Sequence, residues 1–151
     1  MKIKTGSKIP SFALKDQDGK LFDIKELLGW KNFVIYFYPK NDTPGCTKEA
    51  CSFRDQFEDF VNAGAEVIGI SADSVESHKR FAEKYKLTFR LLSDTENKVR
   101  KAFGVPANLL GLLPGRVTYI VDKTGTVRHV FNSQLNAAKH AIEALKEIEQ
   151  L

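Results

Sequence analysis

Short apolar runs alternate with amphipathic stretches along most of this chain. Apolar runs rich in β-branched and aromatic residues, bounded by turn residues, are typical of buried strands. They occur at about 32–38, 66–71, 89–92 and 117–121. Apolar positions at helical spacing lie between and after them, at about 44–62, 75–86, 94–103 and 135–151. Strands that alternate with helices predict an α/β core with parallel strands.

Two hairpins and one apolar loop complete the pattern. The first hairpin has its turn at 16–20, and Asp23 after it is placed to cap a short helix. The second has its turn at 122–125 and follows the strand at 117–121. The loop at 106–115 is unusually apolar. It either packs on the edge of the sheet or forms a contact surface near a site, and the sequence leaves both interpretations open.

The stretch from Pro39 to Cys51, PKNDTPGCTKEAC, contains both cysteines of the chain. Thr43-Pro44 is typical of a helix start, with Thr as the N-cap and Pro in the first turn. Cys46 then lies in that first turn, where backbone N–H groups lack intrahelical partners and the helix dipole favours negative charge. A thiol in this place is expected to ionise readily, and the thiolate is the reactive form.

The second cysteine, Cys51, lies five residues further along the same predicted helix. In a continuous helix the two Cα atoms are about 8–9 Å apart, whereas a disulfide needs less than about 7 Å. A bond between Cys46 and Cys51 therefore requires the first helical turns to unwind. Taken alone, Cys51 is equally consistent with an inert core thiol. Zinc is not indicated, because no second cysteine pair exists, and the spacing is longer than that of a Cys-x-x-Cys redox site.

The composition is that of an ordinary globular protein. Of the 151 residues, 42% are hydrophobic and 28% are charged, and the formal net charge is +4. This length predicts one domain over residues 1–151. The basic residues are spread along the chain, so we expect a solvated surface that binds neither nucleic acid nor membrane. No apolar leader opens the sequence, so we expect a cytoplasmic protein whose cysteines are redox-active rather than structural.

The central stretch resembles the active-site signature of the peroxiredoxin family, closest to its bacterioferritin comigratory protein or peroxiredoxin Q branch. The family pattern Pro-x-x-x-Thr/Ser-x-x-Cys is met by Pro39, Thr43 and Cys46. A second cysteine five positions on, as at Cys51, marks one subgroup. The similarity extends over nearly the whole chain. It implies an α/β, thioredoxin-like fold: a central mixed sheet flanked by helices, with an N-terminal hairpin extension.

The resemblance also implies an antioxidant enzyme, a thiol-dependent peroxidase that reduces hydrogen peroxide and organic hydroperoxides. Cys46 is then the peroxidatic cysteine, which becomes a sulfenic acid, and Cys51 is the resolving cysteine that forms a disulfide with it. Thr43 hydrogen-bonds the peroxide, and Pro39 shields the sulfur from water. Backbone N–H groups near Gly45 stabilise charge on the peroxide oxygens. No cofactor or metal is implied, and thioredoxin or a similar dithiol recycles the disulfide.

Arg116 opens the strand at 117–121, the position from which the family's arginine reaches the peroxidatic cysteine. Its guanidinium stays charged and offers five donors, so the resemblance implies that it holds Cys46 as a thiolate and binds peroxide. Without the resemblance, a surface arginine is the simpler interpretation. Glu49 is a candidate to orient this arginine. We assign no role to the remaining arginines and histidines: Arg54, Arg80, Arg90, Arg100, Arg128, His78, His129 and His140.

Two functions of other kinds stay open at this point. One is a thiol–disulfide oxidoreductase, although the four-residue gap between the cysteines and the presence of Thr43 argue against it. Peroxide consumption separates it from a peroxidase. The other is a redox-regulated binding or chaperone-like protein that uses the loop at 106–115. We expect a monomer or a weak homodimer.

Overall fold

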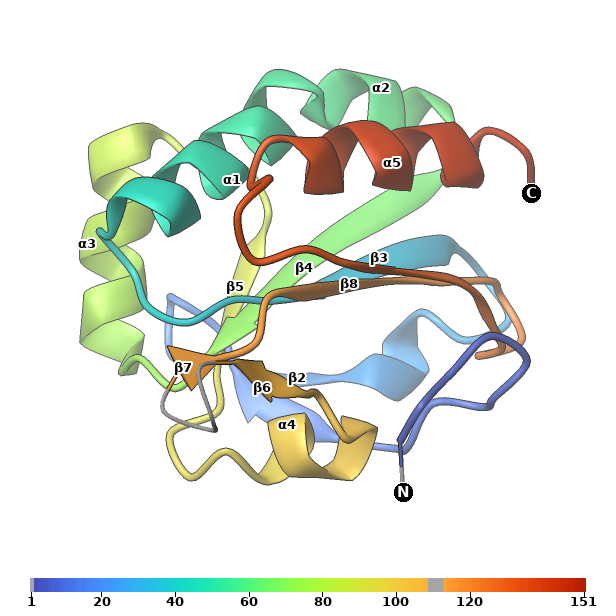
Figure 1. Cartoon of the computed structure of the whole chain (residues 1–151), viewed down its shortest axis with the longest axis horizontal. Helices are drawn as coiled ribbons and strands as arrows, with labels where there is room; N and C mark the ends of the chain where they lie inside the picture. The colour runs from blue at the N-terminus through green and yellow to red at the C-terminus, as the bar shows by residue number, and fades with distance from the viewer. Residues whose placement is uncertain (1, 109–112) are drawn as a thin grey trace.

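The computed structural model describes residues 2–108 and 113–151 (Figure 1). Its strands are β1 (Ala13–Lys15), β2 (Leu21–Asp23), β3 (Asn32–Phe37), β4 (Ala65–Ser71), β5 (Arg90–Ser93), β6 (Ala107–Asn108), β7 (Leu113–Pro114), β8 (Val117–Val121) and β9 (Val127–Asn132). Its helices are the 3-10 helix η1 (Ile24–Glu26), α1 (Pro44–Asp55), α2 (Phe57–Asn62), α3 (Val75–Tyr85), α4 (Lys98–Phe103) and α5 (Lys139–Ile148).

Five strands form the central sheet in the order β5-β4-β3-β8-β9. Strands β3, β4 and β5 are parallel, whereas β8 runs antiparallel to both β3 and β9. The sheet is therefore mixed, and the predicted α/β fold with a mixed sheet is confirmed. Every residue of β3 after Asn32 is buried, as expected for a central strand whose two faces are both covered.

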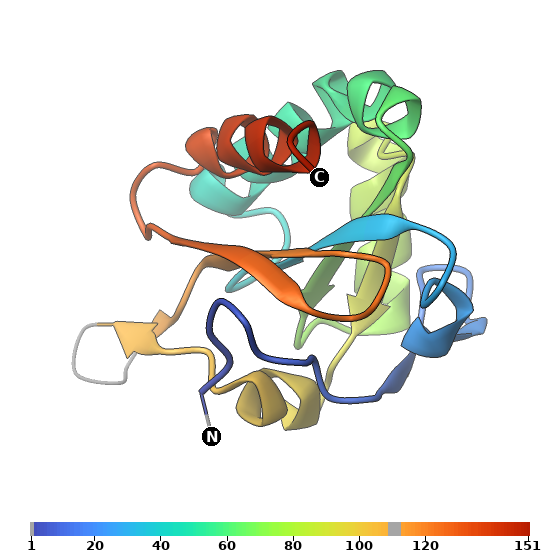
Figure 2. The same cartoon turned by 90° about the vertical axis from the view of Figure 1, so that its right-hand side faces the viewer.

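Helices cover both faces of the sheet. Side chains of α1, α2, α3 and α5 pack with Val34 and Tyr36 of β3, while α4, η1 and the N-terminal segment pack with Phe33, Ile35 and Phe37. Figure 2 shows α1, α2 and α5 on one side of the sheet and the N-terminal segment and α4 on the other. The alternation of neighbouring β3 residues between two cores follows from the two-residue repeat of a strand.

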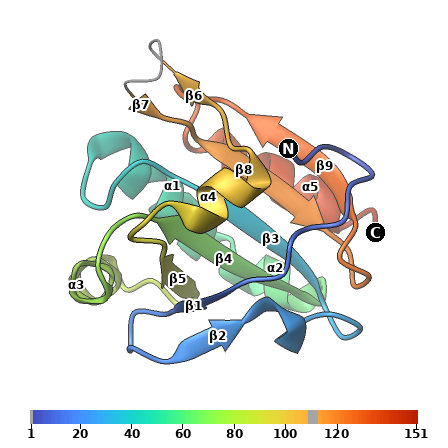
Figure 3. The same cartoon turned by 90° about the horizontal axis from the view of Figure 1, so that it is seen from below.

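The predicted N-terminal hairpin is confirmed as the antiparallel pair β1–β2, which lies beside β5 (Figure 3). The Gln17 side chain fixes it there, since it donates to Phe89 O and accepts from Leu91 N, each at 2.9 Å. Asp23 caps η1 as predicted: its carboxylate accepts from Lys25 N, and a capping box is complete.

The single helix predicted over 44–62 is wrong. Gln56 interrupts it with φ −102° and ψ 7°, so that α1 ends at Asp55 and α2 begins at Phe57. No Gly or Pro lies between Phe53 and Phe60, so the sequence carries no signal for this break. Part of the apolar loop, residues 109–112, lies outside the described residues. None of the described helices is long and apolar enough to cross a membrane.

Candidate active site

Cys46 lies in the first turn of α1, directly after the loop that leaves the end of β3. Its residue exposure is 1%, and both it and the half-buried Cys51 are free thiols. Helix α1 is continuous from Pro44 to Asp55. The two cysteines therefore lie in the intact helix that, by the spacing argument, forbids a disulfide between them.

Two contacts anchor the C-terminal half of α1 to its neighbours. The Phe53 ring stacks on Tyr36, with centroids 4.5 Å apart and planes 14° apart. Arg54 Nη1 donates to Tyr85 O of α3 at 2.7 Å. Any unwinding that brings Cys51 to Cys46 is therefore expected to be confined to the turns before Phe53.

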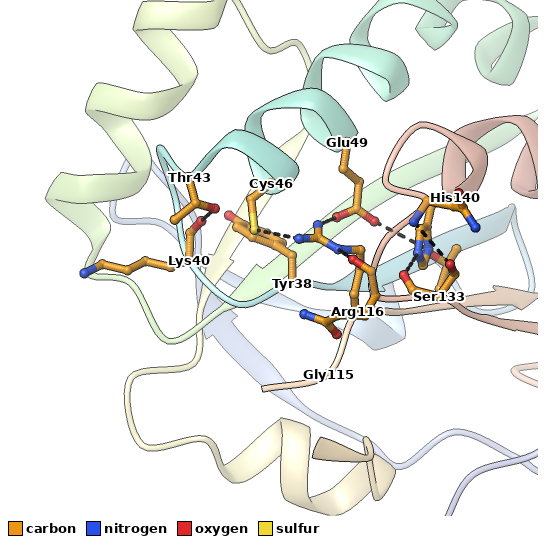
Figure 4. Close-up of polar contacts among 12 residues, drawn as sticks. Tyr38, Lys40, Thr43, Cys46, Glu49, Gly115, Arg116, Ser133 and His140 are labelled. Carbon is orange, nitrogen blue, oxygen red and sulfur yellow. Dashed lines mark hydrogen bonds and ion pairs between the residues drawn. The ribbon is translucent and has the colours of Figure 1, made fainter. Parts of the chain in front are cut away.

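Thr43 occupies the N-cap position of α1, but the predicted capping bond is not formed. Its hydroxyl instead donates to Lys40 O at 2.9 Å, across the loop (Figure 4). The hydroxyl hydrogen is thereby engaged, and the Thr43 oxygen keeps lone pairs for accepting a hydrogen bond. Pro39 lies half-buried in the same loop.

A buried polar network holds this loop against the neighbouring elements. Asn41 donates from its backbone N to Asp73 Oδ2 at 2.9 Å, and Tyr38 donates from its hydroxyl to Asn41 Oδ1 at 2.6 Å. Nδ1 of His78 accepts from Asn41 Nδ2 at 2.8 Å, because Nε2 faces the carbonyl of Leu92 at 3.0 Å and carries the hydrogen. Burial lowers the pKa of His78, which keeps it neutral.

Arg116 joins the sulfur to a carboxylate one helical turn away. Its residue exposure is 4%. Nη2 donates to Cys46 Sγ at 3.4 Å and Nη1 donates to Glu49 Oε1 at 2.5 Å, while Nε donates to Gln134 O at 3.3 Å. One guanidinium therefore spans both side chains (Figure 4). The structure thus brings together Cys46, Glu49 and Arg116, three of the residues that the resemblance singled out.

Gly45 provides the space through which this arginine approaches. A Cβ atom built at Gly45 would lie 2.9 Å from Nη2 of Arg116. Real Cβ atoms do not approach that closely, so any larger residue displaces the guanidinium from its place beside Cys46.

Gly45→Ala is expected to lower the rate constant for reaction with hydrogen peroxide by about ten- to a hundredfold, the cost of misplacing a catalytic group by about 1 Å. The melting temperature should also fall, because the displaced guanidinium is buried and paired with the carboxylate of Glu49. Stopped-flow kinetics and thermal melts measure both. Lys48→Ala, at an exposed position of the same helix, is the matched control. A Gly45→Ala protein as fast as the wild type would contradict the assignment of Arg116.

Glu49 and His140 lie behind Arg116, with no exposure to solvent. Oε2 of Glu49 faces Nδ1 of His140 at 3.5 Å and has no hydrogen-bond partner in the described part of the chain. Burial raises the pKa of Glu49 to about 8, although Arg116 opposes the shift. Burial likewise lowers the pKa of His140 to about 4. Sequence reasoning missed His140, because only folding brings α5 against α1.

Arg100, to which sequence analysis assigns no role, connects the two catalytic segments through its hydrogen bonds. From α4, its Nη2 donates to Tyr38 O at 3.1 Å and its Nη1 donates to Gly115 O at 2.9 Å. Tyr38 precedes Pro39, and Gly115 precedes Arg116. The guanidinium of Arg100 therefore fixes the backbone on either side of the site.

One group of possible metal ligands lies elsewhere, between β9 and α5. His129, Glu143 and Glu147 place ligand atoms within 4.8 Å of one another. Within this group, Nδ1 of His129 lies 4.0 Å from Glu147 Oε1. Among the described residues, no hydrogen bond or ion pair of these three reaches Cys46 or Arg116.

Comparison with known proteins decides the family. The model of the AhpC/TSA family matches residues 5–130. Peroxiredoxin Q, chloroplastic, of Sedum lineare is 56% identical over 150 residues, which are 99% of this chain and 80% of that relative. The chain belongs to the peroxiredoxins. It is similar to the peroxiredoxin Q branch in particular, and it is a thiol-dependent peroxidase on a thioredoxin-like fold.

Solved structures agree with this assignment. Peroxidoxin BcpB from Mycobacterium tuberculosis superposes with a TM-score of 0.90 at 38% identity, covering 99% of this peroxiredoxin and 98% of that chain. Peroxiredoxin Q from Xanthomonas campestris gives a TM-score of 0.84 at 33% identity, covering 92% and 90%. Family membership decides for a peroxidase over the thiol–disulfide oxidoreductase.

The expectation of a cytoplasmic protein is wrong. The relatives from Sedum lineare, Triticum aestivum and Arabidopsis thaliana are all named chloroplastic, and they point to a plastid instead. The expectation rested on residues 1–8, which contain no apolar run. That composition does not distinguish the cytoplasm from the interior of an organelle.

Proposed function

We propose that this peroxiredoxin reduces hydroperoxides through Cys46, that Cys51 resolves the product, and that a thioredoxin-like dithiol protein recycles it. The observation that carries the proposal is the guanidinium of Arg116, which donates to the sulfur of Cys46 at 3.4 Å in a buried site. A fixed cation in contact with a thiol stabilises the thiolate, and it also binds the oxygens of a peroxide.

The first step forms one S–O bond and breaks one O–O bond. The Cys46 thiolate attacks the terminal oxygen of the hydroperoxide, and the bonding electron pair leaves with the second oxygen as an alkoxide, or as hydroxide when the substrate is hydrogen peroxide. That anion takes up a proton and departs as alcohol or water, and Cys46 remains as a sulfenic acid. Arg116 and the first-turn N–H groups beside Gly45 face the charge that develops on the oxygens. The Thr43 oxygen accepts a hydrogen bond from the O–H group of the peroxide.

The second step requires α1 to unwind. The Cys51 thiol attacks the sulfenic sulfur, a disulfide forms and water leaves. A dithiol protein then exchanges with this disulfide and returns both thiols. We place the enzyme in a plastid, as the relatives' names indicate. We expect a monomer or weak homodimer without nucleic-acid or membrane contacts.

Intact mass after one equivalent of hydrogen peroxide tests the proposal. The reduced chain is expected to lose two hydrogens and both free thiols within seconds while staying monomeric. A stable gain of oxygen, or a disulfide-linked dimer, would keep Cys46 but remove Cys51 from its role. No reaction on that timescale would contradict the proposal as a whole.

A further inference from the structure

Glu49 and His140 form a buried pair that the proposed reaction does not use. Both side chains are fully buried, and Nδ1 of His140 lies 3.5 Å from Oε2 of Glu49. Oε2 is also the carboxylate oxygen for which the described residues supply no hydrogen-bond donor. The other oxygen, Oε1, accepts from Arg116 (Figure 4). A buried polar atom without a hydrogen-bond partner is costly, and the number of protons on this pair decides whether Oε2 has one.

The contacts of the imidazole fix one of its protons. Nε2 of His140 lies 2.7 Å from the backbone oxygen of Ser133, which can only accept, so Nε2 carries a hydrogen. Nδ1 lies 2.6 Å from Oγ1 of Thr118, a hydroxyl that can either donate or accept. A further proton therefore has two places to reside: on Nδ1, or on Oε2 of Glu49, which faces it.

Nδ1 of His140 and Oε2 of Glu49 together can hold none, one or two further protons, which gives three states of the pair. With none, the lone pairs of Nδ1 and Oε2 face each other and Glu49 is a buried anion. With two, a buried imidazolium lies near the guanidinium of Arg116, and like charges repel. With one, the pair of Glu49 and His140 is neutral as a whole, and Oε2 gains the contact that it lacks.

We propose that Glu49 and His140 share one proton, and that this sharing leaves the positive charge of Arg116 available to Cys46 and the peroxide. The inference rests on the peroxidase site proposed above. His140 is then a positioning residue, which acts through Glu49 and Arg116 without touching substrate. When the shared proton leaves, the pair becomes an anion that competes with the Cys46 thiolate for the same guanidinium.

The shifted pKa values agree with this proton count. The pKa of Glu49 is raised to about 8 and that of His140 is lowered to about 4, so the folded pair holds one proton between these values. In the unfolded chain the ordinary values of 4.5 and 6.5 apply. The unfolded pair also holds one proton between 4.5 and 6.5, but none above 6.5. The free energy of unfolding therefore falls as the pH rises from 6.5 to about 8, and it is independent of this pair between 4.5 and 6.5.

The other ionisable groups around the carboxyl keep their charge over this range. Tyr36 on β3 and Tyr38 at its end have pKa values raised well above 10.0, mainly by burial, so both stay neutral. Arg116 stays cationic. Cys46, on the same helix as Glu49, is the remaining group, and its reaction is what the experiment measures.

The test compares rate constants for hydrogen peroxide from about pH 6 to about pH 9. His140→Gln keeps an N–H for the Ser133 carbonyl but removes Nδ1. It is expected to slow the reaction about tenfold near neutral pH. The rate constant of the wild type should fall at alkaline pH as the shared proton leaves, and in this variant that fall should occur at lower pH. Adding Glu49→Gln to this variant should restore the rate, because a neutral amide cannot compete for Arg116. His129→Gln, at a half-buried histidine on β9, is the matched control and should keep the wild-type profile.

Two results would overturn the inference: a His140→Gln profile like that of the wild type, or a double variant no faster than His140→Gln alone. A purely structural role for His140 predicts no rescue by Glu49→Gln. Nitrogen NMR of the imidazole and carbon NMR of the Glu49 carboxyl in the reduced wild-type chain give a second readout, which needs no variant. The Glu49 carboxyl should titrate near pH 8, and His140 should not titrate between about pH 5 and about pH 7. A Glu49 carboxyl already ionised at about pH 7, or a His140 titration in that range, would also overturn the inference. If the wild type consumes no peroxide, the proposed function fails, while the NMR result still decides on the shared proton.

Discussion

Cys46→Ser is expected to abolish peroxide consumption, because a serine hydroxyl stays protonated where a thiolate would attack. Cys51→Ser is expected to complete one turnover and then stop as a sulfenic acid, which excess peroxide carries on to sulfinic acid. Intact mass and peroxide consumption without reductant separate the two variants.

In the wild type, oxidation should also remove amide-exchange protection over residues 44–52, since the disulfide requires that part of α1 to unwind.

Each variant serves as the control for the other, because both remove one thiol from the same helix. Repeated turnover by Cys51→Ser at the wild-type rate, with a dithiol protein as reductant, would show that an external thiol resolves the sulfenic acid. Unchanged amide exchange across 44–52 in the oxidised protein would contradict the unwinding of α1.

Arg116→Met is expected to slow the reaction with peroxide by about a hundred- to a thousandfold, the usual cost of losing one donor that stabilises developing charge. Arg116→Lys is the matched control. It keeps the charge, but one ammonium group cannot take the place of a guanidinium whose separate nitrogens contact Cys46 and Glu49. It should therefore recover only part of the rate. Stopped-flow kinetics with hydrogen peroxide measure both variants, and an Arg116→Met protein within twofold of the wild type would refute the role of Arg116.

Much of the fold was predictable, because its signals are local. The strand that became β3 is a continuous apolar run, and Thr43-Pro44 marks the start of α1 where the structure has it. The break at Gln56 could not be predicted, since no turn residue marks it. Residue type alone predicts a capping bond for the Thr43 side chain, whereas its hydroxyl donates to the carbonyl of Lys40.

The site was predictable only where a family motif reached. The resemblance placed Arg116 beside Cys46 across 70 residues of sequence, and the structure has them in contact. Arg100 and His140 carry no motif. Arg100 acts on backbone carbonyls, which every residue has, and His140 acts through a carboxylate that it meets only when α5 packs on α1. Such contacts depend on how the elements pack together, which periodicity does not determine.

The forked contact of Arg116 bears on the reduction potential of the enzyme. In the proposed cycle, unwinding the first turns of α1 takes both Cys46 and Glu49 away from the guanidinium. A buried cation that loses two of its partners is destabilised, and this cost falls on the disulfide form and not on the dithiol form. It raises the reduction potential, by about 30 mV for each 1.4 kcal/mol. The same contacts that prepare the thiolate thus make the oxidised enzyme a better electron acceptor, and they favour its return to the reduced state.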